Sequence, residues 1–421
     1  MSRSKKVRGA APSGKDSTGL PVGDRRAHCH RFSPLNLLTL QRFNAVTTPP
    51  RRRLRRWSIA LALILVVFAV SGCQTLSFYS QAIKGEYQLL AARQPVQKLL
   101  ADSRTPAPLK GKLLLLESLR AFAKSDLKLP VDGHYTKYAD LHRRFVVWNV
   151  VAAPEFSLEP KTWWYPVVGS LEYRGYFSEP GARAYAARLM KKGEDVYVSG
   201  VEAYSTLGWF KDPALNTFIF QPEPDLAEVI FHELGHQRVF ARGDTDFNEA
   251  YATTVGEEGA RRWLRAKGDA AAYDGYLAEL RRNRQFVEAI MATRERLAAL
   301  YGDERLEGGK IKATSQKRSL PPEQLRHQKQ ILLDGLQREY AKLKSEWGGD
   351  SGYDAWFAQP VNNAQLNSVA AYYDLVPAFE RLLQANGGDL EKFYQAVEPL
   401  AHQPKKQRHQ QLRALGGVSQ R

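Results

Sequence analysis

The sequence predicts an α+β fold with a small mixed or antiparallel sheet, followed by a largely helical C-terminal half. Short runs rich in β-branched and aromatic residues, bounded by Pro and Gly, lie between residues 145 and 220. Long stretches with helical spacing of apolar residues follow from residue 222 onward. A hydrophobic fraction of 43% is ample for a packed core.

The predicted elements follow one another in that order. Residues 78–125 read as helical, and 109–127 place several leucines near one stripe. Strands are predicted over 145–153, 162–168, 195–200 and 216–220. Amphipathic helices are predicted over 269–301, 321–347 and 369–385.

The basic charge of the chain belongs to its N-terminal segment. Residues 1–72 carry 11 Arg and 3 Lys against 2 Asp, so they hold +12 of the formal net charge of +17. The remaining +5 is spread over about 350 residues, so we expect no nucleic-acid partner. Residues 1–50 show no sustained apolar period, and we expect a disordered lead or a gene-model extension there.

A secretory signal is predicted over residues 51–72. Five arginines precede an apolar run over 59–70, which is too short to cross a bilayer with ease. Ser71 and Gly72 directly before Cys73 resemble the lipobox of bacterial lipoproteins, in which the cysteine carries lipid. Gln74 after that cysteine favours the outer membrane, facing the periplasm. The competing interpretation is a marginal membrane anchor. The other cysteine, Cys29, lies in the lead, so the mature body has no disulfide.

The stretch FHELGHQRVF at residues 231–240 contains a His-Glu-Leu-Gly-His motif. On a helix, His232 and His236 leave the same face one turn apart, so their ring nitrogens can bind one Zn²⁺ ion. Glu233 projects about 100° round the helix, a position typical of a group that reaches water beside the metal. The competing interpretation is a helix with two partly buried histidines. Asp225 with Glu228 predicts a capping box at the start of the helix.

A catalytic zinc needs a third protein ligand and an open position. Glu249 follows His236 by 13 residues, so an antiparallel helical return could bring it back to the metal. Its alternative role is a capping box with Asp246. Glu257 and Glu258 are the fallback ligands.

Other parts of a catalytic site are less sharply indicated. The Asn248-Glu249 pair resembles the third-ligand signature of thermolysin-like gluzincins, but Thr253 stands where those enzymes usually place a histidine-orienting Asp. Thr253 or Asn248 is the expected partner of a zinc histidine. The candidate contacts to the substrate or transition state are Tyr173, Arg174, Tyr176, Tyr204 and Glu202, the last as an anchor for a substrate amine. Residues 195–205 are the strand nominated to pair with a substrate peptide.

Five segments together resemble the bacterial family known as putative aminopeptidases. They are, in matching order, PVVGSLEYRGYF, AYSTLGWFKDP, HELGHQ, FNEAYATTVGEEG and AYYDLVPAFERLL. The likeness extends over most of the mature chain, from about residue 74 to 403. The resemblance implies a zincin-like metallopeptidase that binds one Zn²⁺ per chain through His232, His236 and Glu249, with Glu233 as the catalytic base. It also implies a lipoprotein of the bacterial cell envelope.

The sequence therefore favours a zinc peptidase acting on peptides or proteins and tethered to the membrane by lipid on Cys73. The alternatives are an envelope metalloendopeptidase and a non-catalytic zinc lipoprotein that binds a partner. The mature chain is expected over 73–421, with a catalytic core at about 140–265 and a helical subdomain at about 266–403.

Overall fold

The computed structural model describes residues 77–165, 169–203, 211–305, 311–313 and 320–416. The chain divides into two units, residues 1–67 and 68–421, and every described residue belongs to the second. The predicted lead and signal segment, Cys73 and Tyr204 therefore lie outside the described residues. Among the described residues, no helix is both long and apolar enough to cross a bilayer.

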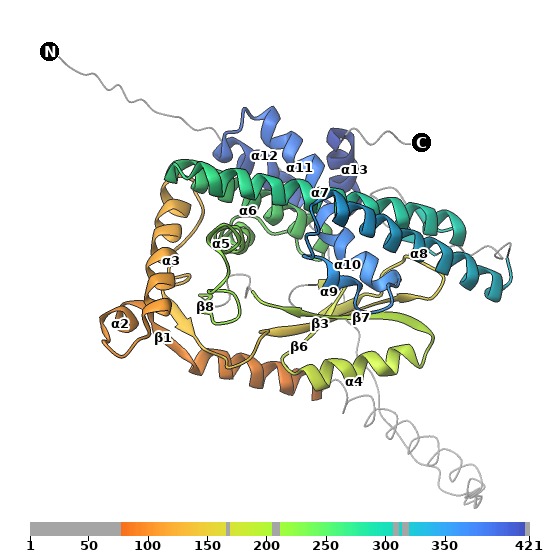
Figure 1. The fold of residues 1–421 in the computed structure, drawn as a ribbon, viewed down its shortest axis with the longest axis horizontal. Coiled ribbons are helices and arrows are strands. Elements are labelled where there is room, and N and C mark those ends of the chain that lie inside the picture. Colours follow the sequence, from red (N-terminus) through yellow and green to blue (C-terminus); the bar gives the residue numbers. More distant parts are fainter. Residues whose placement is uncertain (1–76, 166–168, 204–210, 306–310, 314–319, 417–421) are drawn as a thin grey trace, which may run out of the picture. The chain divides into compact units, whose positions relative to one another are not determined.

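The first half of the described chain combines helices with short strands (Figure 1). Residues 77–91 are helical. The labelled elements that follow are β1 (Arg93–Pro95), α2 (Val96–Ala101), α3 (Ala107–Ser125), β2 (Lys137–Ala139), β3 (Val147–Pro154), β4 (Trp163–Tyr165), β5 (Gly169–Leu171), β6 (Arg174–Tyr176), α4 (Glu179–Met190), β7 (Glu194–Val201) and β8 (Ala214–Leu215).

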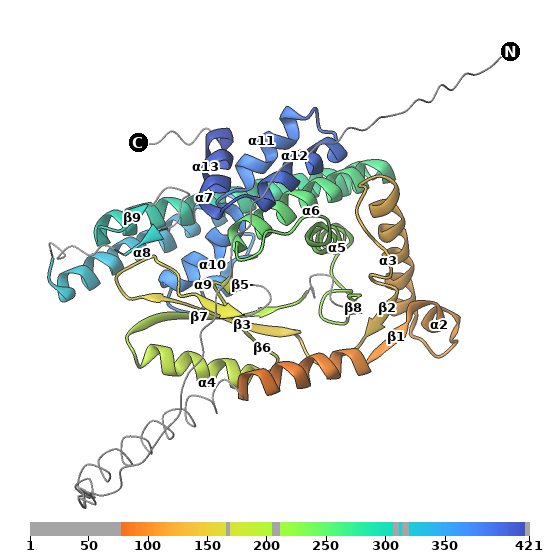
Figure 2. The same cartoon turned by 180° about the vertical axis from the view of Figure 1, so that it is seen from behind.

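The second half is mostly helical. Its elements are α5 (Glu223–Arg238), α6 (Thr245–Lys267), α7 (Ala270–Tyr301), β9 (Glu304–Arg305), β10 (Ile311–Lys312), α8 (Pro322–Glu346), α9 (Asp354–Phe357), α10 (Asn363–Tyr373), α11 (Val376–Ala385), α12 (Leu390–His402) and α13 (Lys405–Gly416). Figure 2 shows these helices from behind.

The strands form small sheets of two or three members. The sheet beside α5 has the order β6-β3-β7, with antiparallel pairing throughout. A second sheet has the order β1-β2-β8, in which β2 and β8 run parallel. Two antiparallel pairs, β4 with β5 and β9 with β10, complete the set in the described chain. The strand nominated for peptide pairing is β7, at one edge of its sheet as described.

The principal core joins both halves of the chain. It extends from Leu89 to Leu412 and includes Phe231 and Leu234 of α5, and Tyr251 and Val255 of α6. Because the C-terminal helices share this core with the helix that carries the motif, their packing holds that helix in position.

Three predicted elements are wrong. The segment 78–125, predicted to be helical, contains the strand β1, which pairs with β2, and a break between α2 and α3, where Pro106 precedes the first turn of α3. Residues 216–220 form turns, since Phe218 and Ile219 donate backbone hydrogen bonds to the carbonyl of Leu215, and the strand is limited to Ala214–Leu215. The helix predicted over 369–385 is broken into α10 and α11. Pro377 lies in the first turn of α11 and has no N–H to donate to the carbonyl four residues earlier, so the hydrogen-bond pattern of α10 is interrupted and a new helix begins.

Both predicted capping boxes are also wrong. Helix α5 begins at Glu223 after the extended Pro222, because Pro224 in the first turn needs no hydrogen-bond acceptor, and Asp225 lies inside that turn. Helix α6 is capped by Asp244, whose side chain accepts from the Phe247 amide. Glu249 is therefore free of a capping role.

Glycines allow α5 and α6 to approach each other closely. A Cβ on Gly256 would lie 2.9 Å from the carbonyl oxygen of Glu228 and 3.1 Å from the Cβ of His232. A Cβ on Gly235 would lie 3.4 Å from Val255. The distance between the motif helix and the helix that carries Glu249 is therefore set by residues without side chains.

We predict that Gly256→Ala lowers the stability of the protein by about 1–3 kcal/mol, because the new methyl forces α6 away from α5. Gly275→Ala in α7 is the matched control, since no atom lies within 4 Å of the added Cβ. That control is expected to be neutral or to stabilise by up to about 1 kcal/mol through helix propensity. Thermal and urea unfolding of both variants would measure the change in stability that each substitution causes. Equal changes for the two variants would contradict the packing argument.

Candidate metal centre

Helices α5 and α6 bring three metal-ligating side chains together. The Nε2 atoms of His232 and His236 are 3.2 Å apart, and the Oε2 atom of Glu249 lies 3.4 Å from the first and 3.7 Å from the second. Corners of a tetrahedron around an ion at ~2.0–2.1 Å from each ligand are separated by ~3.3–3.4 Å. The donor atoms are therefore of the kinds that ligate metals, and their separations are compatible with binding of one metal ion.

Within this trio, the Glu249 carboxylate is paired with the two histidine rings. Burial by itself would raise the pKa of Glu249, but the charge of His236 and hydrogen bonds with both histidines hold it below its usual range. Burial would lower the pKa of His236, but Glu249 raises it. The carboxylate is therefore held ionised, the form that binds a metal.

Glu233 lies at the same cavity as this trio. Burial raises the pKa of its carboxyl group. The charges of His232 and His236 oppose that shift. A raised pKa brings a carboxylate towards the range suited to proton transfer near neutral pH.

The cavity in front of these residues has a volume of about 980 Å³. Its walls come from the helix at 77–91, from the strands β3, β4, β5, β6 and β7, from α5, α6 and α10, and from the turn between β5 and β6. Most of the lining side chains away from the motif are apolar or aromatic, as is usual in binding cavities.

Tyr372 is a site residue that the sequence analysis missed. Its ring stacks on that of His232, with centroids 6.4 Å apart and an interplanar angle of 28°. The negative charge of Glu249 is the largest cause that raises the pKa of the Tyr372 hydroxyl, followed by burial. The hydroxyl therefore stays protonated and can donate a hydrogen bond. Tyr372 belongs to the segment AYYDLVPAFERLL, which contributed to the family resemblance but did not indicate a role for this tyrosine.

The predicted contact residues have different locations. Tyr173 lines the cavity. Arg174 does not appear among the described lining residues, and its guanidinium lies over the ring of Phe78, 3.9 Å from the centroid. Tyr176 is 7% exposed and belongs to the core beneath α4. Glu202 accepts a hydrogen bond from Gln221 at 2.5 Å and is likewise outside the described lining.

The predicted partners of the two motif histidines form no hydrogen bond with them in the described part of the chain. Asn248 instead holds the turn before α6, since its side chain bonds to both the amide and the carbonyl of Ala241. Thr253 is buried, and no hydrogen bond joins it to a described residue of the motif. The Nδ1 atom of His236 is buried and has no hydrogen-bond partner among the described residues.

A second group of acidic residues is an ion-pair cluster. Asp244, Asp246 and His409 offer donor atoms close to one another. Asp244 already pairs with Arg408, with His409 at 2.9 Å and with Lys405 at 3.1 Å. Because cations already neutralise these carboxylates, the cluster serves to attach α13 to the start of α6.

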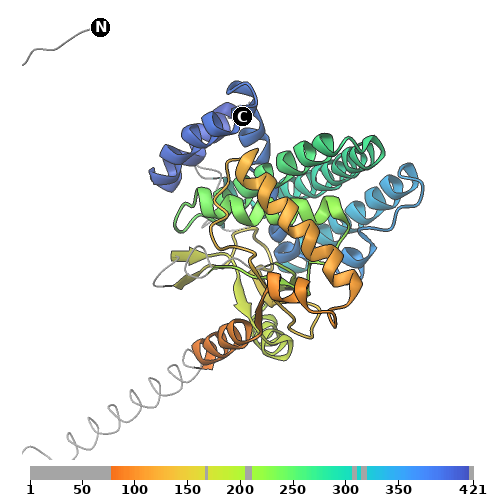
Figure 3. The same ribbon diagram turned by 90° about the vertical axis from the view of Figure 1, so that its left-hand side faces the viewer.

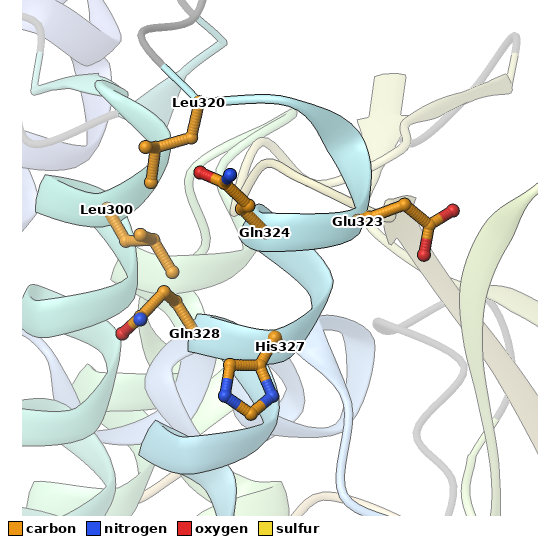
Figure 4. A pocket seen from close by; sticks show the side chains of 6 residues that line it. All are labelled: Leu300, Leu320, Glu323, Gln324, His327 and Gln328. Atoms are coloured by element: carbon orange, nitrogen blue, oxygen red, sulfur yellow. The ribbon is translucent and has the colours of Figure 1, made fainter.

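A second hollow lies between α7 and α8 and has a volume of about 510 Å³. Figure 4 shows that the Glu323 carboxylate points away from the imidazole of His327, with leucines and glutamines between the helices. No converging set of donors is present in this hollow as described.

A buried carboxylate pair lies behind the metal centre. Glu228 accepts a hydrogen bond from the Tyr276 hydroxyl at 2.5 Å. Burial, together with the charge of Glu228, raises the pKa of Glu257 to about 8. The fallback ligand Glu257 is thus part of this pair, and the other, Glu258, forms ion pairs with Arg261 and Arg262.

We predict that Glu257 makes the folded protein less stable as the pH rises from 5 to 8. The folded state holds the proton up to about pH 8, whereas the unfolded chain loses it near the model value of 4.5, so ionisation disfavours the folded state in that window. The loss is expected to reach a few kcal/mol, since each pKa unit is worth ~1.4 kcal/mol. Unfolding measured at four pH values would show it.

Glu257→Gln has no proton to lose and should be increasingly more stable than the wild type as the pH approaches 8. Glu258→Gln is the matched control and should lower stability, because it breaks the ion pairs with Arg261 and Arg262. A Glu257→Gln variant with the same pH dependence as the wild type would contradict the assignment.

The comparisons with known proteins agree with the sequence resemblance. The family model described as "Putative aminopeptidase" matches residues 77–412, which is most of the chain. No curated protein and no solved structure matched the chain. The matched range includes the motif helix, Glu249 and Tyr372, and the chain belongs to the putative aminopeptidase family.

Proposed function

We propose that the protein is a zinc-dependent aminopeptidase with a zincin-like fold that acts in the bacterial cell envelope. The observation that carries the proposal is the triangle of donor atoms from His232, His236 and Glu249, with separations of 3.2, 3.4 and 3.7 Å. The family supports peptide hydrolysis. The lipid anchor on Cys73 remains part of the proposal and rests on the sequence pattern before that residue.

The proposed chemistry divides among a few residues. Zinc bound by the three ligands would supply a Lewis acid able to polarise a substrate carbonyl and to acidify water. Glu233 takes a proton from the attacking water on its carboxylate and passes it to the nitrogen of the leaving amine. Tyr372 donates a hydrogen bond from its hydroxyl to the carbonyl oxygen as negative charge develops there. The apolar walls of the cavity exclude bulk water.

We predict that Glu233→Gln folds, keeps zinc and loses activity by roughly 10²–10⁴-fold, because the amide cannot accept the proton. Hydrolysis of aminoacyl p-nitroanilides and metal analysis of the same preparation would measure both properties. Retention of full activity by a zinc-loaded variant would refute the role of Glu233, whereas absence of hydrolysis by the zinc-loaded wild type would favour the non-catalytic lipoprotein interpretation. Cleavage of N-blocked peptides alone by the wild type would favour the endopeptidase.

We predict that Tyr372→Phe lowers kcat by roughly 10²–10³-fold, with little change in KM, because the donor acts on charge that develops in the transition state. Tyr373→Phe is the matched control, since the Tyr373 hydroxyl accepts a hydrogen bond from Asn283 at 2.8 Å on the other side of the helix. Zinc content is expected to be unchanged in both variants. Similar kcat values for Tyr372→Phe and its control would exclude the proposed role.

A further inference from the structure

One wall of the cavity is formed by the helix at residues 77–91. Figure 3 shows this helix in orange-red beside α4, away from the C-terminal helices. Tyr79, Ile83, Glu86, Tyr87 and Leu90 line the cavity together with the residues of the metal centre. Their spacing places them near one face of the helix. The sequence analysis put the catalytic core at 140–265 and assigned no role to this helix.

This wall leaves apolar side chains uncovered. Ile83 and Tyr87 are each 70% exposed, although both line a cavity whose other walls include Phe177 and Val201. Adjacent apolar side chains that face a cavity and remain exposed are typical of a surface that binds an apolar group.

The same wall carries one carboxylate. The Oε1 atom of Glu86 is buried and accepts no hydrogen bond from any described residue. Burial raises the pKa of Glu86, and the charge of Arg93 only partly offsets that shift. A buried carboxylate without a hydrogen-bond donor is unfavourable, and a cationic ligand in the cavity would relieve it.

Glu86 is held at the cavity by the packing of its helix. Glu86 and Glu233 both line that cavity. The helix is fixed in place because Gln81 accepts a hydrogen bond from the Phe177 amide at 2.9 Å, and Gly85 fits tightly against the Phe177 ring. The position of Glu86 in the cavity is therefore determined by packing.

We propose that Glu86 binds the free α-ammonium group of a peptide substrate and that Ile83 and Tyr87 contact a bulky apolar side chain at its N-terminal end. The inference rests on the proposed peptidase function and deepens it, because it assigns the substrate class to named residues. Glu202, the anchor nominated from sequence, already accepts a hydrogen bond from Gln221 and is outside the described lining of the cavity.

The test measures binding without turnover, so it does not depend on hydrolysis. Zinc-loaded Glu233→Gln protein is titrated by calorimetry at pH 7 with Leu-Leu, acetyl-Leu-Leu and acetyl-Lys-Leu. Leu-Leu is expected to bind roughly 10–100-fold more tightly than acetyl-Leu-Leu, as for a charge-assisted hydrogen bond. Adding Glu86→Gln should abolish that difference, whereas Lys84→Gln, an exposed change on the same helix, should preserve it.

Each outcome decides the proposal. A preference for Leu-Leu that survives Glu86→Gln overturns the assignment, as does the absence of any preference in the parent. A Glu86-dependent gain for acetyl-Lys-Leu as large as for Leu-Leu would assign the site to a lysine side chain instead. Failure of the wild type to cleave any peptide would refute the proposed function and leave this binding result to stand by itself.

Two further measurements separate binding from a structural role. Glu86→Gln should raise the Tm of the ligand-free protein, because it removes a buried carboxylate that has no donor. A lower Tm would indicate a structural ion pair with Arg93 and would contradict the proposal. Ile83→Ala should reduce the preference for Leu-Leu over Ala-Leu by about 5-fold, because apolar contact area is lost, and an unchanged preference would remove the apolar part of the proposal.

Discussion

The close packing of α5 against α6 is the constraint on which the rest of the structure depends. It places Glu249 on one helix within 3.4–3.7 Å of two histidine nitrogens on the other. Gly256 permits this approach, since any side chain there would meet the Glu228 carbonyl and the His232 side chain. The core that extends from Leu89 to Leu412 then holds both helices from behind.

The same packing buries a high density of carboxylates. Glu228, Glu233, Glu249 and Glu257 all lie on these two helices, and burial acts on each of them. The pKa values of these carboxyl groups are shifted in different directions because their neighbours differ. The histidines keep Glu249 ionised, whereas the pKa of Glu257 is raised by burial and by Glu228. A site of this kind costs stability, and an ion bound to the three donors would offset part of that cost.

The local sequence pattern was sufficient to predict the motif helix and the candidate metal ligands. His232 and His236 could be predicted as ligands because four-residue spacing on a helix is a local property. Glu249 could be predicted because a short turn after the motif helix brings the next helix back alongside it. The helix boundaries were less accurate, since Asp244, which caps α6, is also held by ion pairs with Arg408 and His409, far along the chain. Tyr372 and Glu86 could not be predicted, because only tertiary packing brings residues so distant in sequence to the same cavity.

The central claim is that His232, His236 and Glu249 together bind one metal ion, and zinc titration of metal-stripped protein tests it most directly. The account predicts one tightly bound Zn²⁺ per wild-type chain, with that site lost in His236→Ala and in Glu249→Ala and kept in Glu258→Ala. Tight, stoichiometric zinc binding by a folded Glu249→Ala variant, or none by the wild type, would contradict it.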